Sequence, residues 1–129
     1  MRDVKILVAD DERNIADSTV MILQEHGYDA KAAYSGLEAL KISETYAPDV
    51  LLADVIMPGM NGFELALQLK TRFPNCKLLL FSGQASTVSM AQQFSARFTT
   101  AGFRFELLPK PLHPNFLLSK IEQVLLTPI

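Results

Sequence analysis

The sequence predicts an α/β fold in which helices cover a parallel sheet. Short apolar runs alternate along the chain with stretches whose apolar residues recur every three to four positions, as in strands joined by helices. The runs at 5–9, 50–53 and 77–81 are almost continuously apolar, which is typical of central strands buried on both faces. The runs at 29–33 and 103–109 alternate, which favours outer positions. These patterns predict five parallel strands in the order 2-1-3-4-5, the doubly wound order of the flavodoxin-like fold, with five helices.

Residues that begin or end helices divide the chain into elements. Gly27 and Gly102 suit helix ends, and Pro114 suits a first helical turn. Ser35, with Glu38 three residues later, has the pattern of a capping box. The expected strands are 4–9, 29–33, 49–53, 77–81 and 103–109. The expected helices are 14–26, the stretch between Ser35 and Pro48, 62–73, 86–100 and the stretch from Pro114 onward.

Helical spacing also predicts which residues face the sheet. In the second helix these are Leu37, Leu40 and Ile42. In the fourth helix they are Val88, Ala91, Phe94, Phe98 and Ala101. Each helix is therefore expected to bury one apolar stripe.

Charged and hydroxyl residues stand where four predicted strands end. Asp10 and Asp11 follow the first strand, Asp54 the third, Ser82 the fourth and Lys110 the fifth. Because the carboxyl ends of parallel strands share one edge of the sheet, these side chains are expected to converge. Taken singly, each has a plain interpretation as a turn residue, a helix cap or a solvated charge. Together they can hold Mg²⁺ and receive a phosphoryl group.

Asp54 is the expected phosphoacceptor, since a carboxylate can attack phosphorus and form an acyl phosphate. Mg²⁺ would offset the repulsion of an anionic donor, with Asp11 as a direct ligand and Asp10 bound directly or through water. Lys110 and Ser82 would offer positive charge and a hydroxyl donor to the phosphoryl oxygens. Without metal, the three carboxylates should repel one another and raise at least one pKa.

Five short motifs resemble, in order and approximate spacing, those of the two-component response-regulator receiver domain of the chemotaxis-regulator type. They are Asp10-Asp11, Asp54, the loop 57–62, Ser82-Gly83 and Lys110-Pro111. The resemblance covers essentially the whole chain. It implies a cis bond between Lys110 and Pro111, which aims the ammonium at the acids.

The resemblance also implies a phosphorylation-controlled signalling module. Its phosphoryl donor would be a sensor histidine kinase or a histidine phosphotransfer protein, and its Mg²⁺ ligands would be Asp10, Asp11, Asp54 and the backbone carbonyl of Ile56. Phosphorylation would change the face formed by the fourth helix, fifth strand and fifth helix, where a downstream protein binds. The domain would catalyse its own phosphoryl transfer and autodephosphorylation and would not otherwise be an enzyme.

Two features depart from the family pattern. The strand-five aromatic usually stands three residues before the lysine, and here that residue is Leu107, with Phe105 two residues earlier. The 28 positions from Ser82 to Lys110 are several more than the family pattern implies. We hypothesise that the fourth helix is extended, or preceded by an ordered loop, so that the segment 83–109 forms an unusual output face.

Two alternative functions follow from the same residues. A pseudo-receiver would act as a phosphorylation-independent protein-binding scaffold, which the missing aromatic favours. A phosphatase with an aspartyl nucleophile would need an acid/base Asp two residues after Asp54, where the chain has Ile56. The phosphatase is therefore the weaker alternative.

Length and composition exclude several other classes. The 129 residues suit a single receiver domain, 1–129, with no effector domain visible, and the net charge of −2 gives no basic surface for nucleic acid. No apolar stretch reaches the roughly 18 residues of a membrane span, and Lys5 interrupts any secretory signal, so the cytoplasm is the expected location.

Cys76 is expected to be an inert, partly buried thiol, and His26 and His113 lack partners at metal-ligand spacing. The sequence contains no Gly-rich loop of the kind that binds nucleotide phosphates, so no nucleotide site is expected.

Overall fold

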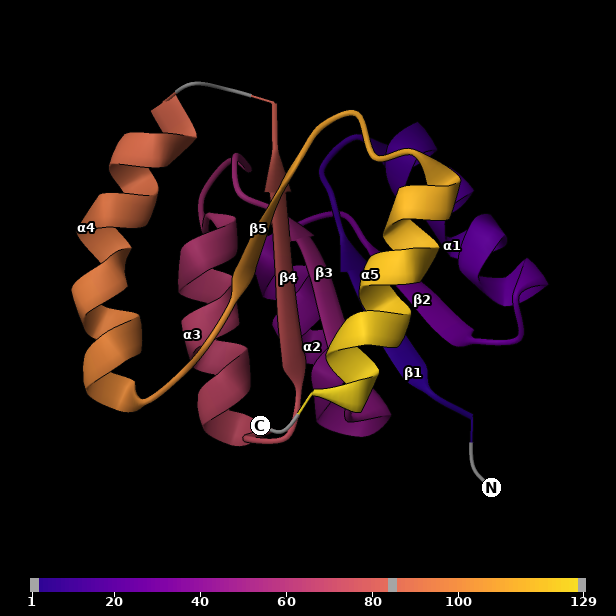
Figure 1. Ribbon diagram of the computed structural model, residues 1–129, viewed down its shortest axis with the longest axis horizontal. Coiled ribbons are helices and arrows are strands. Elements are labelled where there is room, and N and C mark those ends of the chain that lie inside the picture. Colours follow the sequence, from indigo (N-terminus) through magenta and orange to yellow (C-terminus); the bar gives the residue numbers. More distant parts are fainter. Residues whose placement is uncertain (1–2, 84–85, 128–129) are drawn as a thin grey trace.

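The computed structural model describes residues 3–83 and 86–127 and contains a five-stranded parallel sheet in the order β2-β1-β3-β4-β5 (Figure 1). The strands are β1 (Lys5–Ala9), β2 (Asp29–Ala33), β3 (Val50–Asp54), β4 (Lys77–Ser82) and β5 (Glu106–Pro109). The helices are α1 (Arg13–Glu25), α2 (Gly36–Tyr46), α3 (Gly62–Arg72), α4 (Ser86–Ala101) and α5 (Pro114–Leu126). The predicted fold class and strand order are therefore confirmed.

Two hydrophobic cores lie on opposite faces of the sheet. Alternate residues of the central strands point to opposite faces, so Leu7 and Leu51 join one core while Ile6 and Leu52 join the other. The first core contains side chains of α2, α3 and α4, and the second contains side chains of α1 and α5. Figure 1 shows how these helices are arranged around the sheet. Both faces of β1, β3 and β4 are thereby covered, which explains their continuously apolar sequences.

Most predicted boundaries agree with the structure, but the fifth strand is shorter than expected. It begins at Glu106, not at residue 103, because Phe103 and Phe105 pack against the core of α2, α3 and α4 before the chain joins β4. In α2, Leu37 was expected to face the sheet and is 71% exposed, while the inner face is formed by Ala39, Leu40, Ser43 and Tyr46. In the first turn the buried position is taken by Gly36, and Leu37, the next residue, lies about 100° around the helix from it.

Helix caps fix where α2 and α3 begin. Ser35 Oγ accepts the backbone N–H of Glu38 at 3.1 Å, as the capping pattern predicted, and Glu38 Oε1 accepts the N–H of Tyr34 at 3.2 Å. The start of α3 is capped by Asn61, whose Oδ1 accepts the N–H of Glu64 at 2.9 Å. This second cap positions α3 directly after the loop that follows Asp54.

Four phenylalanines tie α4 to the rest of the domain. The ring of Phe63 in α3 stacks on Phe94 with centroids 5.3 Å apart and meets Phe98 edge-on at 6.3 Å. Phe105 lies 5.5 Å from Phe63 and 4.6 Å from Phe98. The predicted stripe of α4 is confirmed at Ala91, Phe94 and Phe98, whereas Ala101 is exposed and the side chain of Val88 lies outside the described part. At 16 residues, α4 is the longest of the described helices, and the stretch just before it, 84–85, lies outside the described residues.

Cys76 is fully within the first core, and its side chain is 1% exposed. Burial raises the pKa of its thiol to about 12, so the thiolate is negligible at neutral pH. The prediction of an unreactive thiol agrees with this environment, although the side chain is more buried than expected.

Gly62 permits α3 to begin against the end of β3. A Cβ at this position would lie 2.5 Å from the backbone oxygen of Asp54 and 2.8 Å from Cα of Val55. We expect Gly62→Ala to lower the free energy of unfolding by about 1–3 kcal/mol, because overpacking here must move backbone. Urea denaturation measures the change. Gly83→Ala is the control, since its Cβ would meet the Cβ of Lys110 at 3.3 Å and only a small adjustment is needed; equal losses for both variants would contradict the argument.

Candidate functional site

The carboxyl edge of the sheet brings the predicted residues together. Asp10 follows β1, Asp54 ends β3, Ser82 ends β4 and Lys110 follows β5. The strand ends are tied by backbone bonds, including Asp10 N–H to the carbonyl of Ala33 at 3.1 Å and Lys110 N–H to the carbonyl of Ser82 at 3.2 Å. The backbone arrangement of the strand ends therefore brings these residues together.

Three carboxylates form an acidic cluster at this edge. One oxygen from each of Asp10, Asp11 and Asp54 lies within 4.8 Å of the others. Asp10 is fully buried and Asp54 is 5% exposed, whereas Asp11 faces solvent. Backbone N–H groups support the buried pair: Glu12 donates to Asp10 Oδ1 at 3.0 Å, and Ile56 donates to Asp54 Oδ1 at 3.3 Å.

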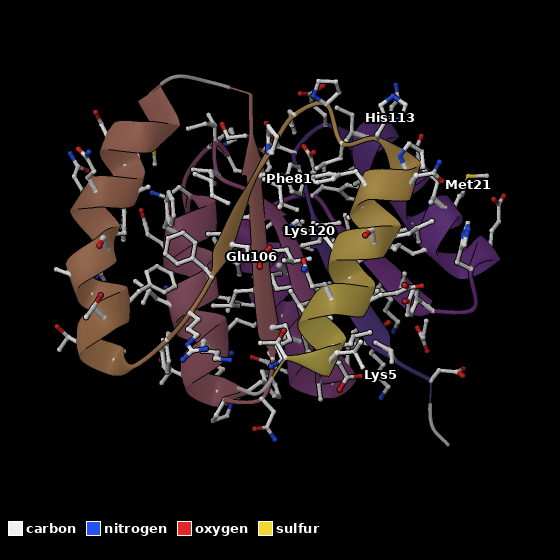
Figure 2. The ribbon with its side chains drawn as sticks, viewed as in Figure 1. Lys5, Met21, Phe81, Glu106, His113 and Lys120 are labelled. Carbon is white, nitrogen blue, oxygen red and sulfur yellow. The ribbon has the colours of Figure 1, made fainter. Side chains whose placement is uncertain are left out.

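Lys110 bridges the two buried acids. Its Nζ lies 3.1 Å from Asp54 Oδ2 and 3.4 Å from Asp10 Oδ2, and it stands 5.0 Å from the ring centroid of Phe81. The Lys110-Pro111 bond is cis, as the resemblance implied. Figure 2 shows Phe81 near the end of β4 that carries the site, with His113 in the neighbouring loop. The lysine therefore balances part of the negative charge inside a largely buried cluster.

Burial raises the pKa of Asp54, and the charge of Asp10 adds to the increase, while the hydrogen bond and charge of Lys110 oppose it. A raised pKa was predicted from repulsion between the carboxylates, but burial is the larger cause because the Asp54 side chain is enclosed. Burial on its own would lower the pKa of Lys110, yet the hydrogen bonds and charges of Asp54 and Asp10 raise it overall. The Lys110 ammonium thus offsets part of the cost of burying the Asp54 carboxylate.

This cost predicts how stability depends on pH. A carboxyl whose folded-state pKa is raised binds its proton more tightly in the folded state, so its stabilising contribution is complete below the unfolded pKa and is lost as pH rises through the folded pKa. We expect Asp54→Asn to raise the free energy of unfolding at pH 7 in EDTA, with the gain shrinking toward about pH 4. Urea denaturation at several pH values measures this. Asp11→Asn, which changes an exposed carboxylate, is the control.

Asp54→Asn could instead prove less stable than the wild type at pH 7. That result would mean that attraction to Lys110, at 3.1 Å, outweighs the burial of the charge.

The other predicted residues lie outside the cluster of three carboxylates. Ser82 is half-buried at the end of β4, and Gly83 leaves room for the Lys110 side chain beside it. Leu107 is 38% exposed on β5, while Phe105 is fixed among the phenylalanines. His26 Nδ1 lies 3.0 Å from the carbonyl of Ile22, and neither histidine belongs to the acidic cluster identified among the described residues.

Sequence reasoning missed a second polar group beside the site, at the start of α1. The hydroxyl of Tyr34 donates to Asp17 Oδ1 at 2.6 Å, and the Arg13 guanidinium lies 4.0 Å over the Tyr34 ring. Hydrogen bonding to Asp17 raises the pKa of Tyr34. The contacts join the residue after β2 to α1, the hydrogen bond across a separation of 17 residues, and no local spacing signals them.

Comparison with known proteins places the chain in a family. Residues 6–122 match the response regulator receiver domain family. The chain is 33% identical over 122 residues to the sensor kinase CckA of Brucella abortus (strain 2308), covering 93% of this chain and 12% of that protein. It is 30% identical over 122 residues to the response regulator MprA of Mycobacterium ulcerans (strain Agy99), covering 95% of this chain and 50% of that protein. The chain thus spans half or less of these two relatives.

Solved structures agree with this assignment. A CheY-like receiver domain protein from Methanospirillum hungatei JF-1 has a TM-score of 0.82 and 31% identity, with 96% of this chain and 94% of that chain covered. The chemotaxis protein CheY4 of Vibrio cholerae has a TM-score of 0.80 and 27% identity, with 95% and 99% covered.

The fold and the acidic edge define a signalling domain of the two-component type. The chain belongs to the response regulator receiver domain family. Within the described ranges 3–83 and 86–127, no helix is both long enough and apolar enough to cross a membrane.

Proposed function

We propose that this domain accepts a phosphoryl group on Asp54 from a histidine kinase or a histidine phosphotransfer protein. The observation that carries the proposal is the Lys110 ammonium, which lies between Asp10 and Asp54 at the carboxyl edge of the sheet, with Asp11 in the same cluster. Such an edge has an oxygen-rich group of ligands, a nucleophile and a fixed positive charge in one place. Residues 1–129 would form a single receiver domain acting in the cytoplasm.

The transfer forms one bond and breaks one. An Asp54 carboxylate oxygen bonds to phosphorus while the bond between phosphorus and the histidine nitrogen of the donor breaks, and the nitrogen keeps that electron pair. Lys110 balances the added charge on the phosphoryl oxygens, and Ser82 offers a hydroxyl to them. Water later attacks phosphorus, the bond between phosphorus and the Asp54 oxygen breaks, and inorganic phosphate leaves with the carboxylate restored. The domain thus turns over its own modification and no other substrate.

The acidic cluster fits Mg²⁺, because that ion prefers oxygen ligands and the cluster offers three carboxylates. Asp10, Asp11 and Asp54 would hold the ion, together with the backbone carbonyl of Ile56. When bound, the ion would neutralise charge between the acceptor and an anionic donor.

The proposed output surface is formed by α4, β5 and α5. Leu107 stands on β5 where the family pattern has an aromatic, and Phe105 is held by contacts with Phe63 and Phe98. We propose that any phosphorylation signal reaches α4 through the phenylalanines and not through a turning ring at position 107. The exposed Leu107 also favours the alternative function, a pseudo-receiver that binds a protein partner without phosphorylation.

Intact mass measurement tests the proposal. The chain is incubated with acetyl phosphate and Mg²⁺, beside samples lacking metal and the variant Asp54→Ala. We expect one added phosphate that requires both Mg²⁺ and Asp54. No added mass in a folded sample, with a known receiver phosphorylated in parallel, would favour the scaffold.

A further inference from the structure

A pocket of about 450 Å³ lies at the edge of the sheet opposite the acidic cluster. It is lined by the first two residues of β4, by the segment leading into β5, and by the ends of α3, α4 and α5. The pocket residues belong to the beginnings of β4 and β5, whereas the acidic cluster lies where the strands end. In Figure 1 the beginnings of β4 and β5 are at the bottom, where the chain leaves α4 and returns to the sheet. Its volume is that of a site for a small molecule.

The pocket has an aromatic wall. Phe98, Phe103 and Phe105 line it, and the last two stand in the connection that the sequence had predicted to be strand. Because that connection is not part of the sheet, its side chains lie between α4 and β5 and shape a recess. Phe98 is 2% exposed, so Phe103 and Phe105 present most of the accessible ring surface to a flat apolar group.

The pocket also has an excess of positive charge. Lys70, Lys77 and Arg104 line it, against the single acid Glu106. Glu106 is already paired, since its Oε2 lies 3.3 Å from Lys120 Nζ, and Figure 2 shows these two residues side by side. In a chain with a net charge of −2, this local balance favours an anionic occupant.

Lys70 is the most informative of these residues, because it is 5% exposed. Its ammonium donates to the backbone carbonyl of Cys76 at 2.6 Å, and no carboxylate of the described residues lies within ion-pair distance of it. Burial lowers the pKa of Lys70, as expected of an ammonium without a counter-ion. Buried lysines are rare unless they are paired, so an anion from outside the chain would complete this site.

We propose that the pocket binds a small aromatic carboxylate, with its ring against Phe98, Phe103 and Phe105 and its carboxylate beside Lys70 and Arg104. The site is separate from the acidic edge, and its occupation does not require phosphorylation of Asp54. The proposal therefore stands whether or not the proposed phosphoryl transfer takes place.

The test is NMR titration of the whole chain with naphthalene-2-carboxylate and with the uncharged naphthalene-2-carboxamide. We expect the carboxylate to bind about tenfold or more tightly than the amide, because a buried charged group gains a charge-assisted partner. The largest amide shifts should fall in 98–106. Lys70→Met should remove the preference for the carboxylate, whereas Lys41→Met, at an exposed position on α2, should leave it unchanged.

A second pair of variants tests whether the ligand occupies the volume of the pocket, without changing any charge. Thr99 lines the pocket and Thr100 does not, and both are exposed on α4. We expect Thr99→Phe to fill the recess and weaken binding, and Thr100→Phe to bind as the wild type does. Equal affinity for carboxylate and amide, shifts centred on the acidic edge, unchanged binding by Thr99→Phe, or no binding at millimolar concentration would each overturn the proposal.

Discussion

Replacing Lys110 with methionine is expected to slow phosphorylation of Asp54 by about two to three orders of magnitude, the usual loss when one donor to a developing negative charge is removed. In the folded protein the ammonium lies 3.1 Å from Asp54 and 3.4 Å from Asp10. Methionine keeps much of the side-chain length but leaves two buried carboxylates without their positive partner. The initial rate of mass gain with acetyl phosphate and Mg²⁺ measures the effect.

Lys120→Met is the matched control for Lys110→Met. Lys120 lies on α5 and pairs with Glu106 at the surface, away from the acidic cluster, so its removal should leave the rate unchanged. If Lys110→Met phosphorylated at the wild-type rate, Lys110 would have no part in the transfer. If both variants were slowed equally, the loss would reflect net charge and not the position of this ammonium.

Replacing Phe63 with alanine is expected to lower the free energy of unfolding by about 3–5 kcal/mol, the cost of emptying a large aromatic site in a packed core. Phe63 is fully buried and contacts the rings of Phe94, Phe98 and Phe105. Its loss therefore removes the aromatic contacts that connect α3 with α4 and with the residue just before β5. Urea denaturation followed by circular dichroism measures the change.

Phe116→Ala controls for the loss of an aromatic residue as such. Phe116 is 40% exposed on α5, and its removal should cost well under half as much as the loss of Phe63. Amide exchange of α4 provides a second measurement, since exchange in 89–101 should quicken in Phe63→Ala. Unchanged exchange there would show that α4 is held by contacts other than the phenylalanines.

The order of the strands in the sheet could be predicted because a strand buried on both faces has a nearly continuous apolar sequence. Strands β1, β3 and β4 are apolar at nearly every position, and β2 is not. The convergence of Asp10, Asp54 and Lys110 followed from topology alone, since parallel strands end on the same edge. These inferences needed no knowledge of side-chain conformation.

Other features depend on contacts that local patterns do not show. Phe103 and Phe105 alternate as strand residues do, yet their packing against α3 and α4 delays the start of β5. Lys70 lies in the last turn of α3, where a lysine usually faces water, and only the fold shows that it is buried against Cys76. The dominance of burial in raising the pKa of Asp54 likewise required the structure.

The contact between Gly62 and the end of β3 has a consequence for changes in chain length. The N–H of Gly62 donates to the carbonyl of Val55 at 2.9 Å, so the intervening residues form a closed ring of fixed circumference. An added or deleted residue between 56 and 61 would either break that bond or shift the register of α3 against Asp54. The loop can therefore accept substitutions far more readily than insertions, and variants of this domain should keep its length even where its residues change.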